Sequence, residues 1–227
     1  MALGLEGRHV VITGGTGALG QAVVEAFVAA GAICHLPVRE QRVTRSPAGA
    51  ELTGGIDLAD EAAVRTFFAG LPPLFASIHL AGGFKAAPIT ETTRGDLDGQ
   101  LEINLVTTFL CCREAVRALR QSGGGRIVNV GSRAADLPGA GTVAYTASKG
   151  AVSALTRAIA VEVRDDGILV NAVLPSIIDT PANRAAMPNA KVERWPKPEE
   201  IARTILWLAS PENRLTSGAL IPVYGNA

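Results

Sequence analysis

Residues 9–31 read "HVVITGGTGALGQAVVEAFVAAG", and this stretch decides the fold. The apolar run at 9–13 ends abruptly in glycines, which is typical of a short buried strand. Residues 18–31 carry apolar side chains at helical spacing and stop at Gly31, which predicts a helix. A strand that passes through a glycine turn into a helix is the first half of a βαβ unit.

Strands and helices continue to alternate along the rest of the chain. We expect further strands over residues 32–38, 52–58, 75–83, 126–132, 168–175 and 218–225, and further helices over residues 60–71, 95–125, 145–167 and 197–210. Such alternation predicts a parallel sheet covered on both faces. We therefore predict an α/β fold, a three-layer doubly wound parallel sheet (Rossmann fold) of about seven strands with helices on both faces. We expect residues 1–227 to form a single domain.

Composition narrows the kinds of partner. Lys+Arg and Asp+Glu are equal at 21 each, so net charge gives no reason to expect nucleic acid or an acidic membrane surface. The three cysteines are an odd number and two are neighbours, which favours a reducing compartment over a disulfide framework. No cysteine or histidine cluster indicates a metal, and no apolar run approaches the ~20 residues of a membrane span. We expect a cytoplasmic protein without a metal.

The glycine turn "TGGTGALG" at 13–20 is a candidate cofactor site. Gly15, Gly17 and Gly20 match the pattern G-x-G-x-x-G, directly after a strand and at the start of a helix. At this place main-chain N–H groups can bind a pyrophosphate, and glycine lets the backbone approach it closely. The alternative is a glycine turn that serves packing alone.

The residues after the second strand bear on the choice of dinucleotide. The segment "LPVREQRVTR" places Arg39 at the strand tip, with Arg42 and Arg45 beyond it. A guanidinium suits the 2′-phosphate of NADP, so we favour NADP over NAD. Glu40 is near enough to keep NAD open, and a solvated arginine loop is the alternative.

Tyr145 and Lys149, in "AYTASKGA" at 144–151, form a candidate proton-transfer pair. Residues four apart share one helix face. General acid–base catalysis works best when the pKa lies near the operating pH, and an adjacent cation can lower a phenol pKa towards it. The alternative is the polar edge of an ordinary helix, with the lysine extended along its surface.

Several motifs in order resemble the short-chain dehydrogenase/reductase family in its single-domain form, over nearly the whole chain. "TGGTGALG" resembles the family's glycine turn and "YTASK" its Y-x-x-x-K motif, and Ser132 precedes Tyr145 by a usual interval. The resemblance implies a catalytic tetrad of Asn104, Ser132, Tyr145 and Lys149. In it Tyr145 is the general acid or base, Ser132 orients the substrate oxygen, Lys149 also binds the nicotinamide ribose, and Asn104 holds a proton-relay water.

The same resemblance implies the cofactor contacts. Asp57, followed by Leu58, would meet the adenine amino group, and Ile178 and Thr180 the nicotinamide carboxamide. The implied cofactor-binding residues are Gly14, Thr16, Gly17, Ala18, Leu19, Gly20, Arg39, Asp57, Leu58, Ala81, Gly82, Gly83, Tyr145, Lys149, Pro175, Ile178 and Thr180. The chain departs from the family where "HLAG" replaces N-N-A-G, so that His79 stands in place of an asparagine. We expect His79 to be buried.

These features predict an NAD(P)-dependent oxidoreductase that transfers hydride between a nicotinamide and a small carbonyl or alcohol substrate. The alternative is a non-catalytic dinucleotide-binding redox sensor on the same fold, which would not need an intact tetrad. The loops at 83–95, 133–143 and 180–197 would choose the substrate, the last as a short substrate loop. Arg133 or Lys85 could admit an anionic one. Small apolar residues in the helix after Lys149, and the family's habits, imply a homo-oligomer, a dimer or homotetramer.

Overall fold

A computed structural model of the chain describes residues 3–40 and 49–226, and its centre is a parallel sheet. The strands are β1 His9–Thr13, β2 Ile33–Pro37, β3 Ala50–Thr53, β4 Leu74–His79, β5 Gly125–Val130, β6 Ile168–Pro175 and β7 Leu220–Val223. Their order is β3-β2-β1-β4-β5-β6-β7, and all neighbouring pairs are parallel. The predicted fold class is therefore confirmed. The order reverses between β1 and β4, which is where such sheets bind ligands beyond the carboxyl ends of the strands.

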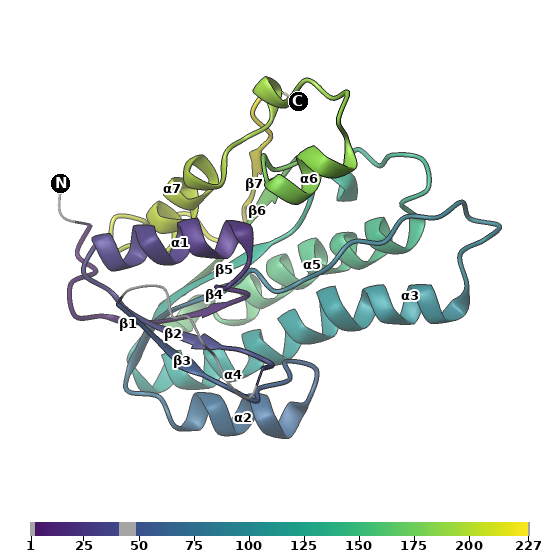
Figure 1. Cartoon of the computed structure of the whole chain (residues 1–227). Helices are drawn as coiled ribbons and strands as arrows, with labels where there is room; N and C mark the ends of the chain where they lie inside the picture. Colours follow the sequence, from purple (N-terminus) through teal and green to yellow (C-terminus); the bar gives the residue numbers. More distant parts are fainter. Residues whose placement is uncertain (1–2, 41–48, 227) are drawn as a thin grey trace.

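Helices cover both faces of this sheet (Figure 1). They are α1 Ala18–Ala29, α2 Glu61–Ala69, α3 Arg94–Gln100, α4 Thr107–Gln121, α5 Val143–Glu162, α6 Pro181–Ala186 and α7 Pro198–Leu208. Helices α1 and α7 lie on one face, and α2, α4 and α5 lie on the other. Asp60 caps α2 by accepting the main-chain N–H groups of Ala62 and Ala63. In the part of the chain described, no helix has the length and apolar character needed to cross a bilayer.

The two faces of the sheet form two separate hydrophobic cores. Successive side chains of β1 alternate between them: Val10 and Ile12 pack with α1 and α7, whereas Val11 packs with α2 and α4. Alternation is the geometric consequence of a pleated strand, and a strand buried on both faces needs apolar residues at every position. This is why "HVVIT" is a continuous apolar run rather than an alternating one.

The long helix predicted over 95–125 is present as an unbroken helical run over 94–121, but its hydrogen-bond register changes inside this run, which the sequence did not predict. A π-helical turn, Leu101–Val106, separates α3 from α4. Within it the carbonyls of Ile103 and Asn104 accept hydrogen bonds from the hydroxyls of Thr107 and Thr108, at 2.8 and 2.7 Å. Such side-chain bonds can replace main-chain ones and support a wider turn. π-turns of this kind are frequent at functional sites.

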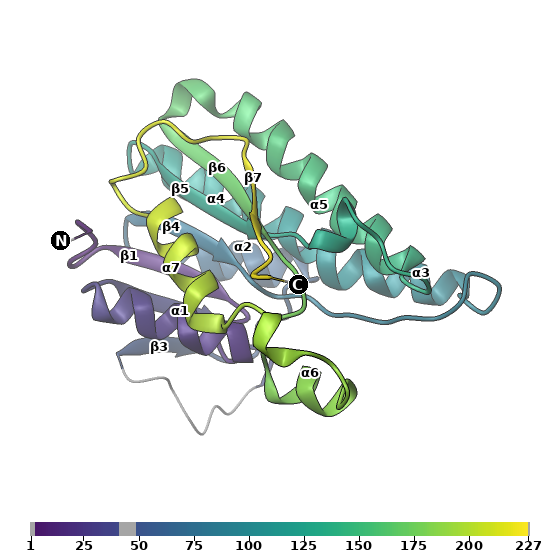
Figure 2. The same ribbon diagram turned by 90° about the horizontal axis from the view of Figure 1, so that it is seen from above.

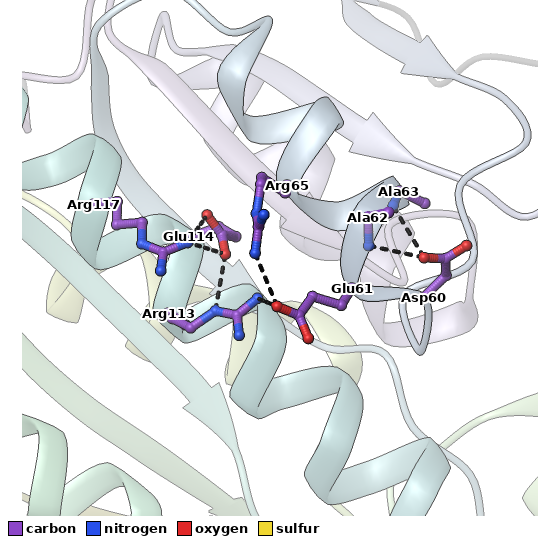
Figure 3. Close-up of polar contacts among 8 residues, drawn as sticks. All are labelled: Asp60, Glu61, Ala62, Ala63, Arg65, Arg113, Glu114 and Arg117. Carbon is purple, nitrogen blue, oxygen red and sulfur yellow. Dashed lines mark hydrogen bonds and ion pairs between the residues drawn. The ribbon is translucent and has the colours of Figure 1, made fainter.

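An ion-pair network ties α2 to α4 (Figure 3). Glu61 on α2 accepts from Arg65 at 2.9 Å and pairs with Arg113 on α4 at 3.0 Å. Glu114, only 4% exposed, accepts from Arg113 Nε at 2.9 Å and from Arg117 at 2.7 Å. A buried carboxylate is stable when it is paired in this way. The network therefore fixes the packing of two helices on one face of the sheet.

Two further segments differ from the predicted elements. The third strand covers Ala50–Thr53 rather than 52–58. The predicted substrate loop at 180–197 contains α6 and a 3₁₀ turn, Val192–Arg194, and it is anchored by the buried Trp195. Seen from above, α6 lies near the end of β7, and the loop between β4 and α3 extends beside the first turns of α5 (Figure 2).

Candidate active site

The glycine turn between β1 and α1 leaves no room for side chains. Gly14 has a φ of +67°, and a Cβ there would lie 2.8 Å from the main-chain nitrogen of Ala81. A Cβ on Gly20 would lie 2.1 Å from the Gly14 carbonyl oxygen. Helix α1 begins after Gly17 without a side-chain cap in the described residues. Its first N–H groups thus keep their capacity to bind an anion, and the cradle fits the pyrophosphate of a dinucleotide.

The ends of β1 and β4 form the floor beside this turn. Thr13 Oγ1 accepts from the main-chain N–H of Ala81 at 3.3 Å, and Thr13 O accepts from the N–H of Leu80 at 3.2 Å. Two predicted cofactor residues, Gly14 and Ala81, therefore lie beside each other. Thr13 was not among the predicted site residues, although it is the first residue of the glycine motif.

The remaining predicted cofactor residues near the glycine turn are partly exposed and partly packed against the core. Thr16, Gly17 and Ala18 are exposed, whereas Leu19 packs against the core beneath α1. Leu58 packs against the core on the other face.

Arg39 and Asp57 lie together beyond the ends of β2 and β3. Arg39 Nη2 lies 3.1 and 3.2 Å from the two carboxylate oxygens of Asp57. The pKa of Asp57 is lowered, first by the N–H of Ala59 and then by Arg39. Both side chains are exposed, which screens their interaction. The structure thus brings together the two residues predicted for the adenosine end of the cofactor, whereas Arg42 and Arg45 lie outside the described residues.

Asn104 is fully buried in the π-turn and holds the segment after β4. Its Oδ1 accepts from the N–H of Gly83 at 3.1 Å, and its Nδ2 donates to the Gly83 carbonyl at 3.0 Å and to Ser148 Oγ at 3.1 Å. A Cβ on Gly82 would lie 2.6 Å from Asn104 Oδ1. Asn104 therefore joins the predicted cofactor residues Gly82 and Gly83 to α5. Ser148, within "YTASK", is a site residue that the sequence reasoning missed.

Lys149 is buried, with 6% of the residue exposed, at the carboxyl end of β5. Its Nζ donates to the Val130 carbonyl at 2.8 Å. Burial lowers its pKa to about 8. An ammonium has three donors, so two remain for hydroxyls such as those of a ribose. A Cβ on Gly82 would lie 3.4 Å from this Nζ, which places Lys149 beside Asn104 and Gly82.

Ser132 and Tyr145 lie close together at the carboxyl edge of the sheet. Ser132 caps the 3₁₀ turn Arg133–Ala135 by accepting the Ala134 N–H at 3.1 Å. Burial raises the pKa of Tyr145, and a hydrogen bond with Ser132 partly lowers it again. The tuning of this pKa by Lys149 stays a prediction.

The side chain of Phe84, directly after Gly82 and Gly83, packs against Tyr145. The ring of Phe84 meets the Tyr145 ring edge-on, with centroids 4.9 Å apart and an angle of 79° between the planes. Phe84 itself is 64% exposed. Edge-to-face packing of this kind is favourable and shields one side of the phenol from water. The sequence indicated Phe84 as a loop residue but not its contact with Tyr145.

Pro175, Ile178 and Thr180 line the end of β6 and the start of α6. The Ile178 side chain packs against the core, and its carbonyl accepts from Asn183 Nδ2 at 2.8 Å. Thr180 Oγ1 caps α6 by accepting the N–H of Asn183 at 3.2 Å. Within the described ranges, no hydrogen bond joins these three residues to the predicted tetrad. Their contact with a nicotinamide stays a prediction.

Comparison with known proteins identifies the family. A family model described as short chain dehydrogenase matches residues 8–191. The chain belongs to the short chain dehydrogenase family. It is thus an oxidoreductase by family, as the sequence predicted.

Curated relatives of this short chain dehydrogenase match almost end to end. It is 32% identical to an L-xylulose reductase from Bos taurus over 240 residues, covering 99% of this chain and 98% of the relative. It is also 32% identical to a cyclic-di-GMP-binding biofilm dispersal mediator protein from Escherichia coli K12, with 96% of each chain covered. Relatives at this similarity therefore include both an enzyme and a protein named for binding.

A solved structure gives the same arrangement. A 3-oxoacyl (acyl-carrier-protein) reductase from Agrobacterium tumefaciens C58, with NADP bound, is 26% identical and superimposes with a TM-score of 0.88. The match covers 100% of this short chain dehydrogenase and 96% of that reductase.

Proposed function

We propose that this short chain dehydrogenase is an NAD(P)-dependent oxidoreductase that interconverts a small carbonyl compound and its alcohol. The observation that carries the proposal is Tyr145 close to Ser132, with the buried Lys149 one helical turn further along α5. A proton donor, an orienting hydroxyl and a cation at one edge of the sheet are what carbonyl reduction requires of the protein. A bound nicotinamide supplies the hydride.

Each residue has a part that follows from its position. Ser132 donates a hydrogen bond to the substrate carbonyl oxygen and holds it beside the phenol. Tyr145 gives its proton to that oxygen during reduction and takes one from the alcohol during oxidation. The ammonium of Lys149, fixed on the Val130 carbonyl, stabilises the phenolate and binds ribose hydroxyls with its two remaining donors. Asn104 positions Gly82 and Gly83 beside Lys149.

NADP is the favoured cofactor because of Arg39. The guanidinium lies beyond β2 beside Asp57, where the adenosine end of a dinucleotide bound at the glycine turn would come. A 2′-phosphate would offer it a stronger, doubly charged partner. The related reductase with NADP bound is consistent with this choice.

Titration of the purified chain with NADPH and NADH, followed by nicotinamide fluorescence, tests both proposals. We expect tighter binding of NADPH. Arg39→Ala should raise the NADPH Kd roughly tenfold, with less than about a threefold change for NADH. Arg65→Ala, which removes another exposed arginine, is the matched control and should change neither. Tighter binding of NADH by the wild type would overturn the choice of NADP, and binding of neither would overturn the proposed function.

A redox sensor on the same fold is the second candidate, and the relative named for cyclic-di-GMP binding favours keeping it. The two candidates differ in turnover. A sensor would bind NADPH without consuming it in the presence of ketones or aldehydes, whereas the enzyme consumes it. Loss of NADPH absorbance at 340 nm over a carbonyl panel therefore separates them.

We also propose that the chain is a single domain that acts as a dimer or homotetramer in the cytoplasm. Exposed apolar side chains on the π-turn, α4 and α5 support self-association; they are Ile103, Val106, Phe109, Val143 and Val161. The three cysteines are free and buried, which agrees with a reducing compartment. Light scattering coupled to size-exclusion chromatography gives the oligomeric state directly, and a monomer would contradict it.

A further inference from the structure

Arg133 is fixed one residue away from the hydroxyl that orients the substrate. It is the first residue of the 3₁₀ turn Arg133–Ala135, whose start is capped by Ser132 through the N–H of Ala134. The cap ties the Arg133 backbone to the same hydroxyl group that the proposed reaction uses. The main chain of Arg133 is therefore fixed beside Ser132, at the substrate end of the proposed site.

The guanidinium of Arg133 is held in place by an aromatic ring from another element. Its Cζ lies 5.5 Å from the centroid of the Tyr224 ring, within the range of a cation–π contact. Tyr224 directly follows β7, and its carbonyl accepts from Ser176 Oγ, just after β6, at 2.7 Å. Arg133, after β5, thus reaches the residue after β7 at the carboxyl edge of the sheet, where this fold binds ligands.

One donor of this guanidinium is unpaired in the described part of the chain. The Nε of Arg133 is buried and has no hydrogen-bond partner there. Among residues 3–40 and 49–226, no carboxylate forms an ion pair with it. A buried donor without a partner is costly, and a cation held beside an active site without a counter-ion can be satisfied by an anionic ligand.

Two other cations of the substrate loops, Lys85 and Arg184, are already paired. Lys85, which the sequence left open as an alternative, forms an ion pair with Asp96. Arg184 on α6 pairs with Asp179 through two N–H groups. Arg133 differs from both because it stacks on an aromatic ring rather than pairing with an acid. The structure therefore distinguishes between the two candidates that the sequence offered.

We propose that the carbonyl substrate of this chain carries an anionic oxygen group, a carboxylate or a phosphate, and that Arg133 binds it. The proposal rests on the proposed function, because Ser132 and Tyr145 must hold the carbonyl oxygen while Arg133 holds the anion. A guanidinium presents its donors in a planar fork that matches two oxygens of such a group. Two points of attachment orient the carbonyl carbon without any further polar contact.

Matched pairs of substrates test the proposal. Each 2-oxo or 3-oxo acid is compared with its methyl ester, and dihydroxyacetone phosphate with dihydroxyacetone, by initial rates of NADPH oxidation. We expect kcat/KM to be at least about tenfold higher for the charged member of one series, and that series says whether the group is a carboxylate or a phosphate. Equal or faster reduction of the neutral members, or no reduction of any charged member, would overturn the proposal. The proposed function has its own tests in cofactor binding and in turnover of neutral carbonyls.

Two substitutions assign the effect to Arg133. Arg133→Gln should lower kcat/KM for the charged substrate roughly 10- to 100-fold, mainly through KM, with less than about a threefold change for the neutral partner. Arg133→Lys keeps the charge but not the fork, and should recover part of the loss. Lys85→Gln removes one charge from the same loops and should leave the ratio unchanged. NADPH affinity should stay at the wild-type value in all three.

Two outcomes of these substitutions would contradict the role of Arg133. If Lys85→Gln abolished the preference and Arg133→Gln kept it, Lys85 would be the anion-binding residue. If Arg133→Gln weakened charged and neutral substrates alike, Arg133 would serve the structure of the turn only. Either result contradicts the proposal.

Discussion

The side chain of Asn104 and the main chain of Gly83 exchange two hydrogen bonds, N–H to Oδ1 at 3.1 Å and Nδ2 to carbonyl at 3.0 Å. A third bond, from Nδ2 to Ser148 Oγ, uses the remaining donor of the amide. The loop after β4, the π-turn and α5 are therefore joined through one buried side chain. This arrangement gives Asn104 a positioning role, which its place in the motif alone did not indicate.

Replacing Asn104 by alanine should disrupt this junction. Asn104→Ala leaves the Gly83 N–H and carbonyl without their partner, so we expect the free energy of unfolding to fall by about 2–3 kcal/mol. Because Gly82 and Gly83 would lose their fixed position beside Lys149, kcat/KM should fall as well. Urea denaturation and initial rates measure the two effects. Thr108→Val, which removes only the bond to the Asn104 carbonyl, is the control, and unchanged stability of Asn104→Ala would contradict the role.

Gly20 should tolerate no side chain. In Gly20→Ala the added Cβ would lie 2.1 Å from the Gly14 carbonyl oxygen, so the turn must move. We expect the NADPH Kd to rise at least about tenfold, because the N–H groups at the start of α1 lose their alignment. Gly99→Ala is the matched control: a Cβ on Gly99, in α3, meets nothing within 4 Å. Fluorescence titration of both variants decides the matter, and equal affinities would rule out the turn as the pyrophosphate site.

The buried Lys149 should make stability depend on pH in the alkaline range. Its pKa is lowered from 10.5 to about 8, so between these values the unfolded chain binds a proton that the folded chain has lost. Stability should therefore rise with pH in this window, by up to about 3 kcal/mol. Lys149→Met removes the titrating group and should show a flatter profile from pH 8 to 9.5 in urea denaturation. Parallel profiles for the two proteins would show that Lys149 is not buried as a cation at neutral pH.

His79 should have the corresponding effect in the acid range. It is buried between Ser77 and Asn129, with bonds of 2.8 Å to each, and burial lowers its pKa to about 4. Between pH 6.5 and 4 the His79 imidazole is protonated in the unfolded chain but neutral in the folded one. The free energy of unfolding therefore decreases by about 3 kcal/mol as the pH falls through this range. His79→Asn introduces the asparagine that the family has at this position, and it should make the free energy of unfolding depend less on pH in this range. An identical acid profile in both proteins would mean that His79 is not the group responsible.

Much of the fold follows from local sequence. Helical and strand periodicity predicted the seven strands, and the buried run at 168–175 matches β6 in both bounds. The glycine turn was predictable because a side chain at Gly14 or Gly20 would overlap neighbouring main-chain atoms, so that only glycine fits there. Both signals are local, and local signals are visible in a single sequence.

The π-turn inside the long helix was not predictable, because the spacing of apolar residues does not reveal a change of hydrogen-bond register. The π-turn Leu101–Val106 shows only in three dimensions, where Asn104 reaches Gly83. Contacts between distant segments were hidden for the same reason: Arg39 with Asp57, Phe84 with Tyr145 and Arg133 with Tyr224. Each depends on the sheet order, which brings loops far apart in sequence to one edge.

The central claim is that Tyr145 transfers the proton, and Tyr145→Phe tests it most directly. The measurement is the single-turnover rate of NADPH oxidation with saturating carbonyl substrate, together with the NADPH Kd from fluorescence. We predict a Kd within about threefold of the wild type and a rate lowered at least ~100-fold, because phenylalanine keeps the ring packing on Phe84 but has no proton to give. A Tyr145→Phe variant that binds NADPH normally and reduces substrate at the wild-type rate would contradict the account.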